Sequence, residues 1–115
     1  MNQYLLFRSN GVTHGIKIKY VSGTGTAYGD DYISASECFY RTKEMERHFI
    51  RIGDRILSVS GVLDIVNVLK SHKVPPFFRT TPISEVTEIN GEIVVLLNVE
   101  KMLEKCLNKG ENHGQ

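Results

Sequence analysis

Residues 86–107 read VTEINGEIVVLLNVEKMLEKCL, and this stretch carries the clearest evidence for the fold class. Asn90-Gly91 is a dipeptide that two-residue β-hairpin turns favour, because both turn residues must adopt positive φ. The runs on either side, 86–89 and 92–97, are rich in β-branched residues, which are typical of strands. The sequence therefore predicts a β-hairpin here.

The second half of the stretch has helical spacing. Asn98 provides an N-cap, and Gly110 is expected to end the helix. The apolar residues between them recur at i, i+3, i+4, i+7 and i+8, which is one face of an amphipathic helix: Val99, Met102, Leu103, Cys106 and Leu107. We expect a C-terminal helix followed by a frayed tail over 111–115.

Another hairpin is expected near the N-terminus. The run 4–8 leads to Asn10-Gly11, and the run 14–21 then alternates apolar and polar residues. The apolar set is Ile16, Ile18 and Tyr20, and the polar set is Lys17 and Lys19. Alternation with period two is typical of a strand that is buried on one face.

Between these hairpins the sequence predicts more strands. Gly53-Asp54 suits a two-residue turn between strands 48–52 and 55–59, and another strand is expected over 62–69. With the hairpins at either end, this makes about seven short strands and one clear helix, the pattern of a small all-β barrel capped by a terminal helix.

Two segments are less regular. Residues 74–78 contain adjacent prolines, which supply no donor to a strand ladder, so we expect a loop. Residues 22–36 have turn composition. Ser34 and Glu37 then form a capping box, which predicts a helix over 36–47.

Length and composition favour one soluble domain. The chain has 115 residues with 14 basic and 13 acidic side chains, so no general attraction to nucleic acid or an anionic membrane is expected. No apolar run approaches the ~20 residues of a membrane span, and no signal peptide is expected. The two cysteines, Cys38 and Cys106, form no disulfide framework or zinc motif, and we expect Cys106 to be a buried free thiol. We expect a cytoplasmic protein.

No catalytic site, metal site or cofactor is expected. The glycine-rich run 23–29 lacks the Gly-Lys-Ser/Thr of a phosphate-binding loop, and Asp30 and Asp31 lack further acidic partners. We expect His14 and His48 to be partly exposed strand residues that could be neighbours across a sheet. No serine or cysteine lies in a nucleophile motif.

Two alternatives from other classes stay open. The segment 23–31 would serve a ligand-binding barrel or an enzyme, and bound nucleotide or metal there would favour that reading. Lys17, Lys19 and Tyr20 would serve a small barrel that binds single-stranded nucleic acid, and salt-sensitive binding to oligonucleotides would favour it.

Three blocks of the chain, in order, resemble the CheW-like domain family. The strand 4–7 followed by HGIKIKYV (14–21) resembles the family's opening, y-G-I-x-I-x-x-V. Residues 49–70 resemble its central hairpin and the strand V-d-x-V-x-x-V. EIVVLLNVEKML (92–103) resembles its closing strand and helix, and it is the most specific of the three.

The resemblance implies a mostly β fold of small SH3-like barrels with a C-terminal α-helix, in a single domain over 1–110. It also implies a cytoplasmic, non-catalytic adaptor that couples chemoreceptors to the histidine kinase CheA through exposed barrel edges and an apolar groove. The partner-binding residues expected on this basis are Val21, Val62, Ile65, Val66 and Val68. A purely structural role in the core is an equal alternative for all five.

The chain departs from the family pattern between these blocks. The family's first barrel normally holds the stretch G-V-x-x-L-R-G-x-x-x-P-V-x-D-L, whose arginine is linked to partner binding, and 22–47 is too short to contain it. No residue here inherits that role, and Gly23 stands where an acidic residue is common. Missing strands leave unpaired edges. We therefore expect either one complete barrel with an augmented sheet or a homodimer that completes the first barrel in trans.

Overall fold

The computed structural model describes residues 2–74 and 82–112, with side chains described as far as residue 106 in the last helix. The elements, in chain order, are β1 (Gln3–Ser9), β2 (Val12–Lys17), the 3-10 turn η1 (Ile18–Tyr20), β3 (Val21–Gly25), β4 (Ile33–Ser34), α1 (Ala35–Tyr40), β5 (His48–Ile52), β6 (Arg55–Val59), β7 (Gly61–Asn67), β8 (His72–Lys73), β9 (Ile83–Ile89), β10 (Glu92–Leu97) and α2 (Val99–Asn112).

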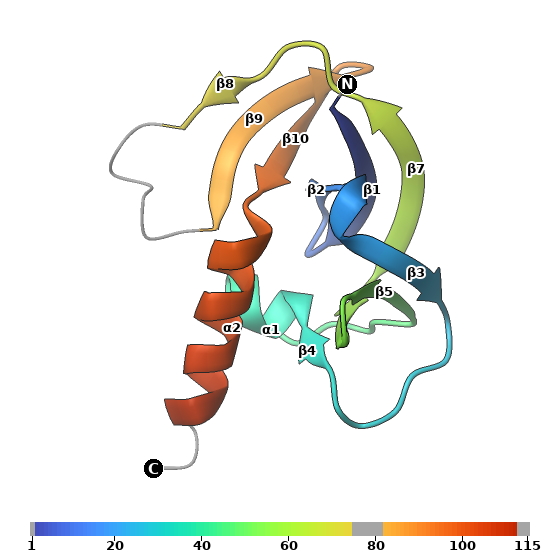
Figure 1. Cartoon of the computed structure of the whole chain (residues 1–115), viewed down its shortest axis with the longest axis vertical. Coiled ribbons are helices and arrows are strands. Elements are labelled where there is room, and N and C mark those ends of the chain that lie inside the picture. Colours follow the sequence, from blue (N-terminus) through green and yellow to red (C-terminus); the bar gives the residue numbers. More distant parts are fainter. Residues whose placement is uncertain (1, 75–81, 113–115) are drawn as a thin grey trace.

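The strands form two sheets. A six-stranded sheet has the order β7-β1-β2-β10-β9-β8, and a four-stranded sheet has the order β3-β5-β6-β4. Neighbouring strands are antiparallel except for the parallel pairs β2–β10 and β4–β6. In Figure 1 the six-stranded sheet occupies the upper part of the molecule, and β3, β5, α1 and α2 lie below it.

The three predicted hairpins are confirmed. β1 pairs with β2, β5 with β6, and β9 with β10, all antiparallel. Both residues of the Asn10-Gly11 turn have positive φ (54° and 76°), as do both residues of Asn90-Gly91 (52° and 80°). Gly53 also has positive φ, at 63°. The turn residues are therefore those that tight hairpins require.

Strand β1 is buried on both of its faces. Leu5 and Phe7 point into a larger core, whereas Tyr4 and Leu6 point into a smaller one. The larger core is made of Leu5, Phe7, Ile16, Ala35, Cys38, Ile50, Ile52, Leu57, Val59, Leu97, Val99, Met102 and Cys106. The smaller core is made of Tyr4, Leu6, Val68, Val94 and Leu96. Each fully buried large side chain contributes about 1.5–3 kcal/mol, so this strand stabilises both cores at once.

The single strand predicted over 14–21 is wrong in one respect. β2 ends at Lys17, η1 turns the chain, and β3 begins at Val21 in the other sheet. Ile18, Tyr20 and Val21 all still pack against the larger core. The alternation of apolar residues therefore continues through the turn at which the strand ends.

The segment 22–36, for which turns were expected, is more regular than predicted, because its first residues belong to strand β3. Gly25 in β3 lies under the ring of Phe49, and a Cβ at this position would lie 2.6 Å from the Phe49 Cε2 atom. The glycine is needed here for close packing between β3 and β5, and not for a turn.

The predicted helices differ from the structure at their ends. Ser34 is the N-cap of α1, as expected, and its Oγ accepts a hydrogen bond from Glu37 N at 3.3 Å. The helix stops at Tyr40 and not at residue 47, because Arg41 adopts the left-handed conformation (φ 55°). α2 runs to Asn112, past Gly110. The predicted loop 74–78 lies, from residue 75 on, outside the described residues, as does the tail from 113.

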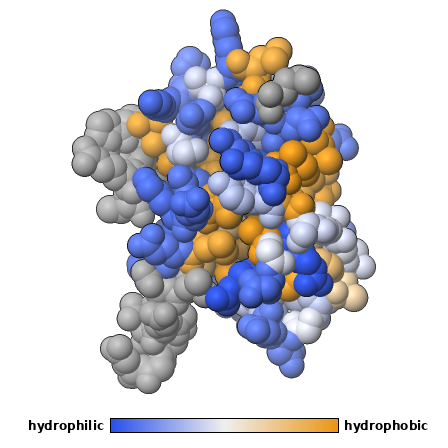
Figure 2. All heavy atoms as spheres, in the orientation of Figure 1, coloured by the Kyte–Doolittle hydropathy of each residue, from blue (hydrophilic) through white to orange (hydrophobic). Residues whose placement is uncertain are grey.

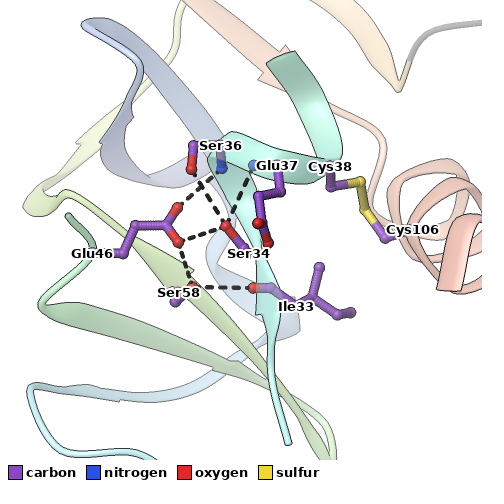
Figure 3. Close-up of a disulfide and its surroundings, with 8 residues drawn as sticks. All are labelled: Ile33, Ser34, Ser36, Glu37, Cys38, Glu46, Ser58 and Cys106. Carbon is purple, nitrogen blue, oxygen red and sulfur yellow. Dashed lines mark hydrogen bonds between the residues drawn. A yellow bond between two sulfur atoms is a disulfide. The ribbon is translucent and has the colours of Figure 1, made fainter. Parts of the chain in front are cut away.

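Cys38 and Cys106 form a disulfide between α1 and α2, so the expectation of a free thiol is wrong (Figure 3). Their Cα atoms lie 5.6 Å apart although the residues are separated by 68 positions. The burial predicted for Cys106 is confirmed, with 8% of its surface exposed. In the chain-entropy model, closing a loop of this length stabilises the fold by about 4 kcal/mol.

Gly15→Ala tests the close packing of the smaller core. An added Cβ would lie 2.9 Å from Leu96 Cδ2 and 3.3 Å from Leu6 Cδ2, so both leucines would have to shift. We expect a loss of about 1–3 kcal/mol in the free energy of unfolding, measured by urea denaturation. Gly23→Ala is the matched control, because nothing lies within 4 Å of a Cβ there. Equal losses in the two variants would contradict this packing.

Candidate functional site

Strand β7 is the outer strand of the six-stranded sheet, and it pairs only with β1. Its outward edge therefore presents unpaired backbone N–H and C=O groups, a template for another strand. Apolar side chains gather along this part of the surface (Figure 2). Leu63 is 39% exposed, Ile65 54% and, just beyond the strand, Leu69 93%. We call these three residues, with the strand edge, the β7 edge.

A groove adjoins the end of this strand. It is lined by residues 67–70, His72, residues 86–89 of β9, and Ile93, and it encloses about 670 Å³. Val68 belongs to the smaller core, whereas Ile93 is 61% exposed. This β7–β9 groove therefore extends the apolar surface of the β7 edge towards β10.

A second groove lies beside the C-terminal helix. It is formed by residues 19–22, the β5–β6 turn 52–55, and Val99, Glu100 and Leu103 of α2, and it encloses about 610 Å³. Two basic and two acidic side chains line it: Lys19, Arg55, Asp54 and Glu100. This α2 groove thus combines an apolar lining with balanced charge.

The five residues predicted to bind partners do not form one site. Val21 lies in the α2 groove and is half-buried. Val62 packs against the larger core and Val66 against the smaller core. Val68 is 9% exposed, whereas Ile65, at the β7 edge, is 54% exposed. Val68 therefore has a structural role in the core, and Ile65 is the most exposed of the five residues.

Sequence reasoning missed the exposed Ile93. It offered the whole apolar strand 62–69 as a contact candidate, but its five named residues did not include the exposed Leu63 and Leu69. Leu63 was not singled out because a regular strand would alternate buried and exposed residues, whereas residues 63–65 are all exposed. The pairing of β7 with β1 shifts register between Leu5 and Phe7, which places a bulge at this point. A bulge leaves no clear signal in an apolar run.

A polar cluster surrounds Glu46, beside α1 (Figure 3). Its Oε1 accepts hydrogen bonds from Ser34 Oγ at 2.6 Å and Ser58 Oγ at 2.8 Å. Its Oε2 accepts one from Ser36 N at 3.0 Å, and the Tyr28 hydroxyl donates to its carbonyl oxygen. None of these serines is hydrogen-bonded to a histidine in the described part of the chain, so the cluster lacks the geometry of an activated serine. It attaches the start of α1 to β6.

His14 is buried, which corrects the expectation of partial exposure. Its Nε2 is hydrogen-bonded to the Tyr40 hydroxyl at 2.7 Å, and its ring stacks on Phe7 with a centroid distance of 5.0 Å. Burial lowers its pKa from 6.5 to about 4, and backbone groups of Val12 and Phe7 partly oppose the shift. His14 is therefore neutral at pH 7. His48 lies in the other sheet, so the two are not cross-strand neighbours.

The structure also bears on the metal-site and nucleic-acid alternatives. No group of three or more potential metal-ligating side chains occurs in residues 2–74 and 82–112. Lys19 Nζ lies over the Tyr20 ring, 5.2 Å from its centroid, so two of the three residues of the nucleic-acid alternative contact each other. Within the same residues, no helix is long and apolar enough to cross a membrane.

The fold has a known counterpart. The crystal structure of the scaffolding protein TtCheW from Thermoanaerobacter tengcongensis matches with a TM-score of 0.68, over 84% of this chain and 88% of that chain, at 12% sequence identity. No protein-family model and no curated protein matches the sequence. The chain thus has a divergent CheW-like fold, mostly β with SH3-like barrel architecture and a C-terminal helix, as the resemblance predicted.

The buried histidine predicts a pH-dependent stability. The pKa of His14 is lower in the folded state than in the unfolded state. Its contribution to the free energy of unfolding is therefore retained above pH 6.5 and is lost as the pH falls towards 4. Between pH 7 and pH 5, we expect the free energy of unfolding of the wild type to fall by about 2 kcal/mol more than that of His14→Gln, as measured by urea denaturation. His72→Gln, an exposed residue of β8, should behave like wild type. An NMR titration of the His14 ring with an unshifted midpoint would contradict the assignment.

Proposed function

We propose that this protein is a non-catalytic adaptor of chemotaxis signalling, which acts in the cytoplasm and couples chemoreceptors to a CheA-type histidine kinase by protein–protein contacts. The observation that carries the proposal is the likeness of its fold to a scaffolding protein over 84% of the chain. The collinear blocks 4–21, 49–70 and 92–103 support it independently. A fold alone does not fix a function, so the surfaces must supply the rest of the argument.

An adaptor needs two separate binding surfaces, and the described residues offer two candidates. The β7 edge belongs to the outer strand of one sheet, whereas the α2 groove lies between α2, η1 and the β5–β6 turn. In Figure 1, β7 and α2 lie on opposite sides of the molecule. Two partners can therefore bind at the same time without competing for one surface.

The two surfaces suit different kinds of contact. An edge strand binds a partner by adding its strand to the sheet, with main-chain hydrogen bonds giving affinity and exposed side chains giving specificity. Ile65 and Leu63 supply those side chains at the β7 edge. The α2 groove, which contains Val21, is a concave surface of apolar and charged residues and suits the side of a helix or loop.

Binding must proceed without the arginine that the family's first barrel carries, since the stretch that holds it is absent here. Arginine is a frequent source of binding energy at interfaces. Apolar contacts at the two surfaces are the alternative source, and the balanced net charge of +1 offers no long-range steering. Complexes of moderate affinity and weak salt dependence are expected.

Calorimetry with the regulatory domain of the CheA kinase and with a chemoreceptor cytoplasmic tip, both from the same organism, tests the proposal. We expect saturable binding to at least one partner. Ile65→Glu should weaken binding at the β7 edge by about tenfold or more, because it places a charge in an apolar contact. Its melting temperature should stay unchanged, since the side chain is 54% exposed.

Met45→Glu is the matched control, because Met45 is 69% exposed and lies outside both surfaces. Equal effects of the two substitutions would argue against the β7 edge as a binding surface. If neither partner binds wild type at concentrations well above the micromolar range of transient complexes, the adaptor function is wrong and only the fold stands.

We also propose that two copies pair through the four-stranded sheet. Its outer strands, β3 and β4, each pair with a single neighbour, as expected for a first barrel that has lost strands. Light scattering coupled to size exclusion at high concentration should give twice the 13.0 kDa monomer mass. A monomer at every concentration would exclude the dimer and leave an augmented single barrel.

A further inference from the structure

We propose that Cys38 and Cys106 form a reversible redox site, in which the disulfide holds the later part of α2 against α1 and reduction releases it. The pair uses both cysteines of the chain. Neither cysteine belongs to the β7 edge or lines the α2 groove, so the bond is available for a role of its own.

The position of Cys38 is fixed without the bond. Its helix, α1, is attached at its start by the hydrogen bonds from Ser34 and Ser36 to Glu46 (Figure 3). At its end, the Tyr40 hydroxyl is bonded to the buried His14. Both ends of this six-residue helix are thus attached to strands, and Cys38 in the middle stays in place when the disulfide opens.

The start of α2 is also fixed without the bond. Asn98 Oδ1 accepts a hydrogen bond from Lys101 N at 2.9 Å, and Val99 and Met102 are buried in the larger core. Cys106 lies one helical turn after Met102, with its sulfur bonded to α1. Beyond Met102, Leu103 still packs against the larger core, and the disulfide adds the covalent attachment of this part of α2.

Opening the bond would change the α2 groove. Leu103 lines this groove and lies three residues before Cys106, hence on the same face of the helix. Once Cys106 is released, the turn that carries Leu103 loses its covalent attachment, and the terminal part of a helix frays readily. The effect on partner binding rests on the function proposed above, whereas the redox behaviour and the motion of α2 do not.

The chemistry balances with a small thiol such as glutathione. A thiolate attacks one sulfur of the disulfide, forms a mixed disulfide and releases the other cysteine as a thiolate, which takes up a proton. A second small thiolate then attacks the mixed disulfide and releases the second cysteine. Two small thiols are oxidised to one small disulfide, and the protein gains two thiols. Because 6% of Cys38 and 8% of Cys106 is exposed, attack requires local opening at α2.

Equilibration of the full chain in glutathione buffers, from fully reduced to fully oxidised, tests the site. Acid quenching, alkylation and mass spectrometry give the fraction of bridged protein. We expect this fraction to move from below about 10% to above about 90% within that range, with circular dichroism showing a folded chain at both ends. A bond that persists in fully reduced buffer, a bond that never forms, or unfolding on reduction would each overturn the proposal.

Hydrogen exchange locates the effect. Amides 103–106 should exchange at least about tenfold faster in reduced than in oxidised protein, while those of β10 stay unchanged. Cys38→Ser/Cys106→Ser should exchange like reduced wild type in both buffers, and reduced wild type carries the comparison if that variant does not fold. Equal exchange in the two states would overturn the proposal that the disulfide controls the motion of α2.

Calorimetry in both buffers is a separate test. Absence of partner binding in both states would overturn the proposed function and leave the redox result intact.

Discussion

The fold depends on a two-stranded ribbon, β1 and β2, that is packed on both faces. Residues Tyr4 to Phe7 are all buried, and they alternate between the smaller and the larger core. β10, parallel to β2, divides its residues in the same way, with Val94 and Leu96 on one side and Leu97 on the other. Burial on both faces explains why residues 4–7 of β1 and 94–97 of β10 are continuous apolar runs. Gly15 belongs to this packing, because the space where its side chain would stand is filled by Leu96 and Leu6.

The second constraint is the attachment of α1. This short helix contacts three parts of the chain: β6 and the segment before β5 through Glu46, β2 through the His14–Tyr40 hydrogen bond, and α2 through the disulfide. A helix of six residues is not stable by itself, since nucleation alone outweighs its few hydrogen bonds. Its tertiary attachments therefore hold it, and they join the four-stranded sheet to the rest of the fold.

Local physics decided which features the sequence could predict. The hairpins could be predicted because each turn needs positive φ, which the residues Asn10-Gly11, Gly53 and Asn90-Gly91 adopt. The helix N-caps at Ser34 and Asn98 could be predicted equally well. The break between β2 and β3 was missed because apolar alternation continues through it. The end of α1 depends on one left-handed residue, Arg41, which is not a residue type that signals such a turn. The disulfide and the burial of His14 arise from contacts between distant segments, which no local pattern contains.

The candidate surfaces were hardest to predict for a related reason. In the run 62–69, the apolar residues of the core and of the surface are of the same chemical type, so residue type does not separate Val68 in the core from Ile65, which is 54% exposed. At 12% identity, this chain shares its fold with TtCheW over 84% of its length and few of the residues themselves. The fold alone therefore does not identify the residues of a binding surface. Exposed apolar residues at an open sheet edge persist at the risk of aggregation unless a partner covers them.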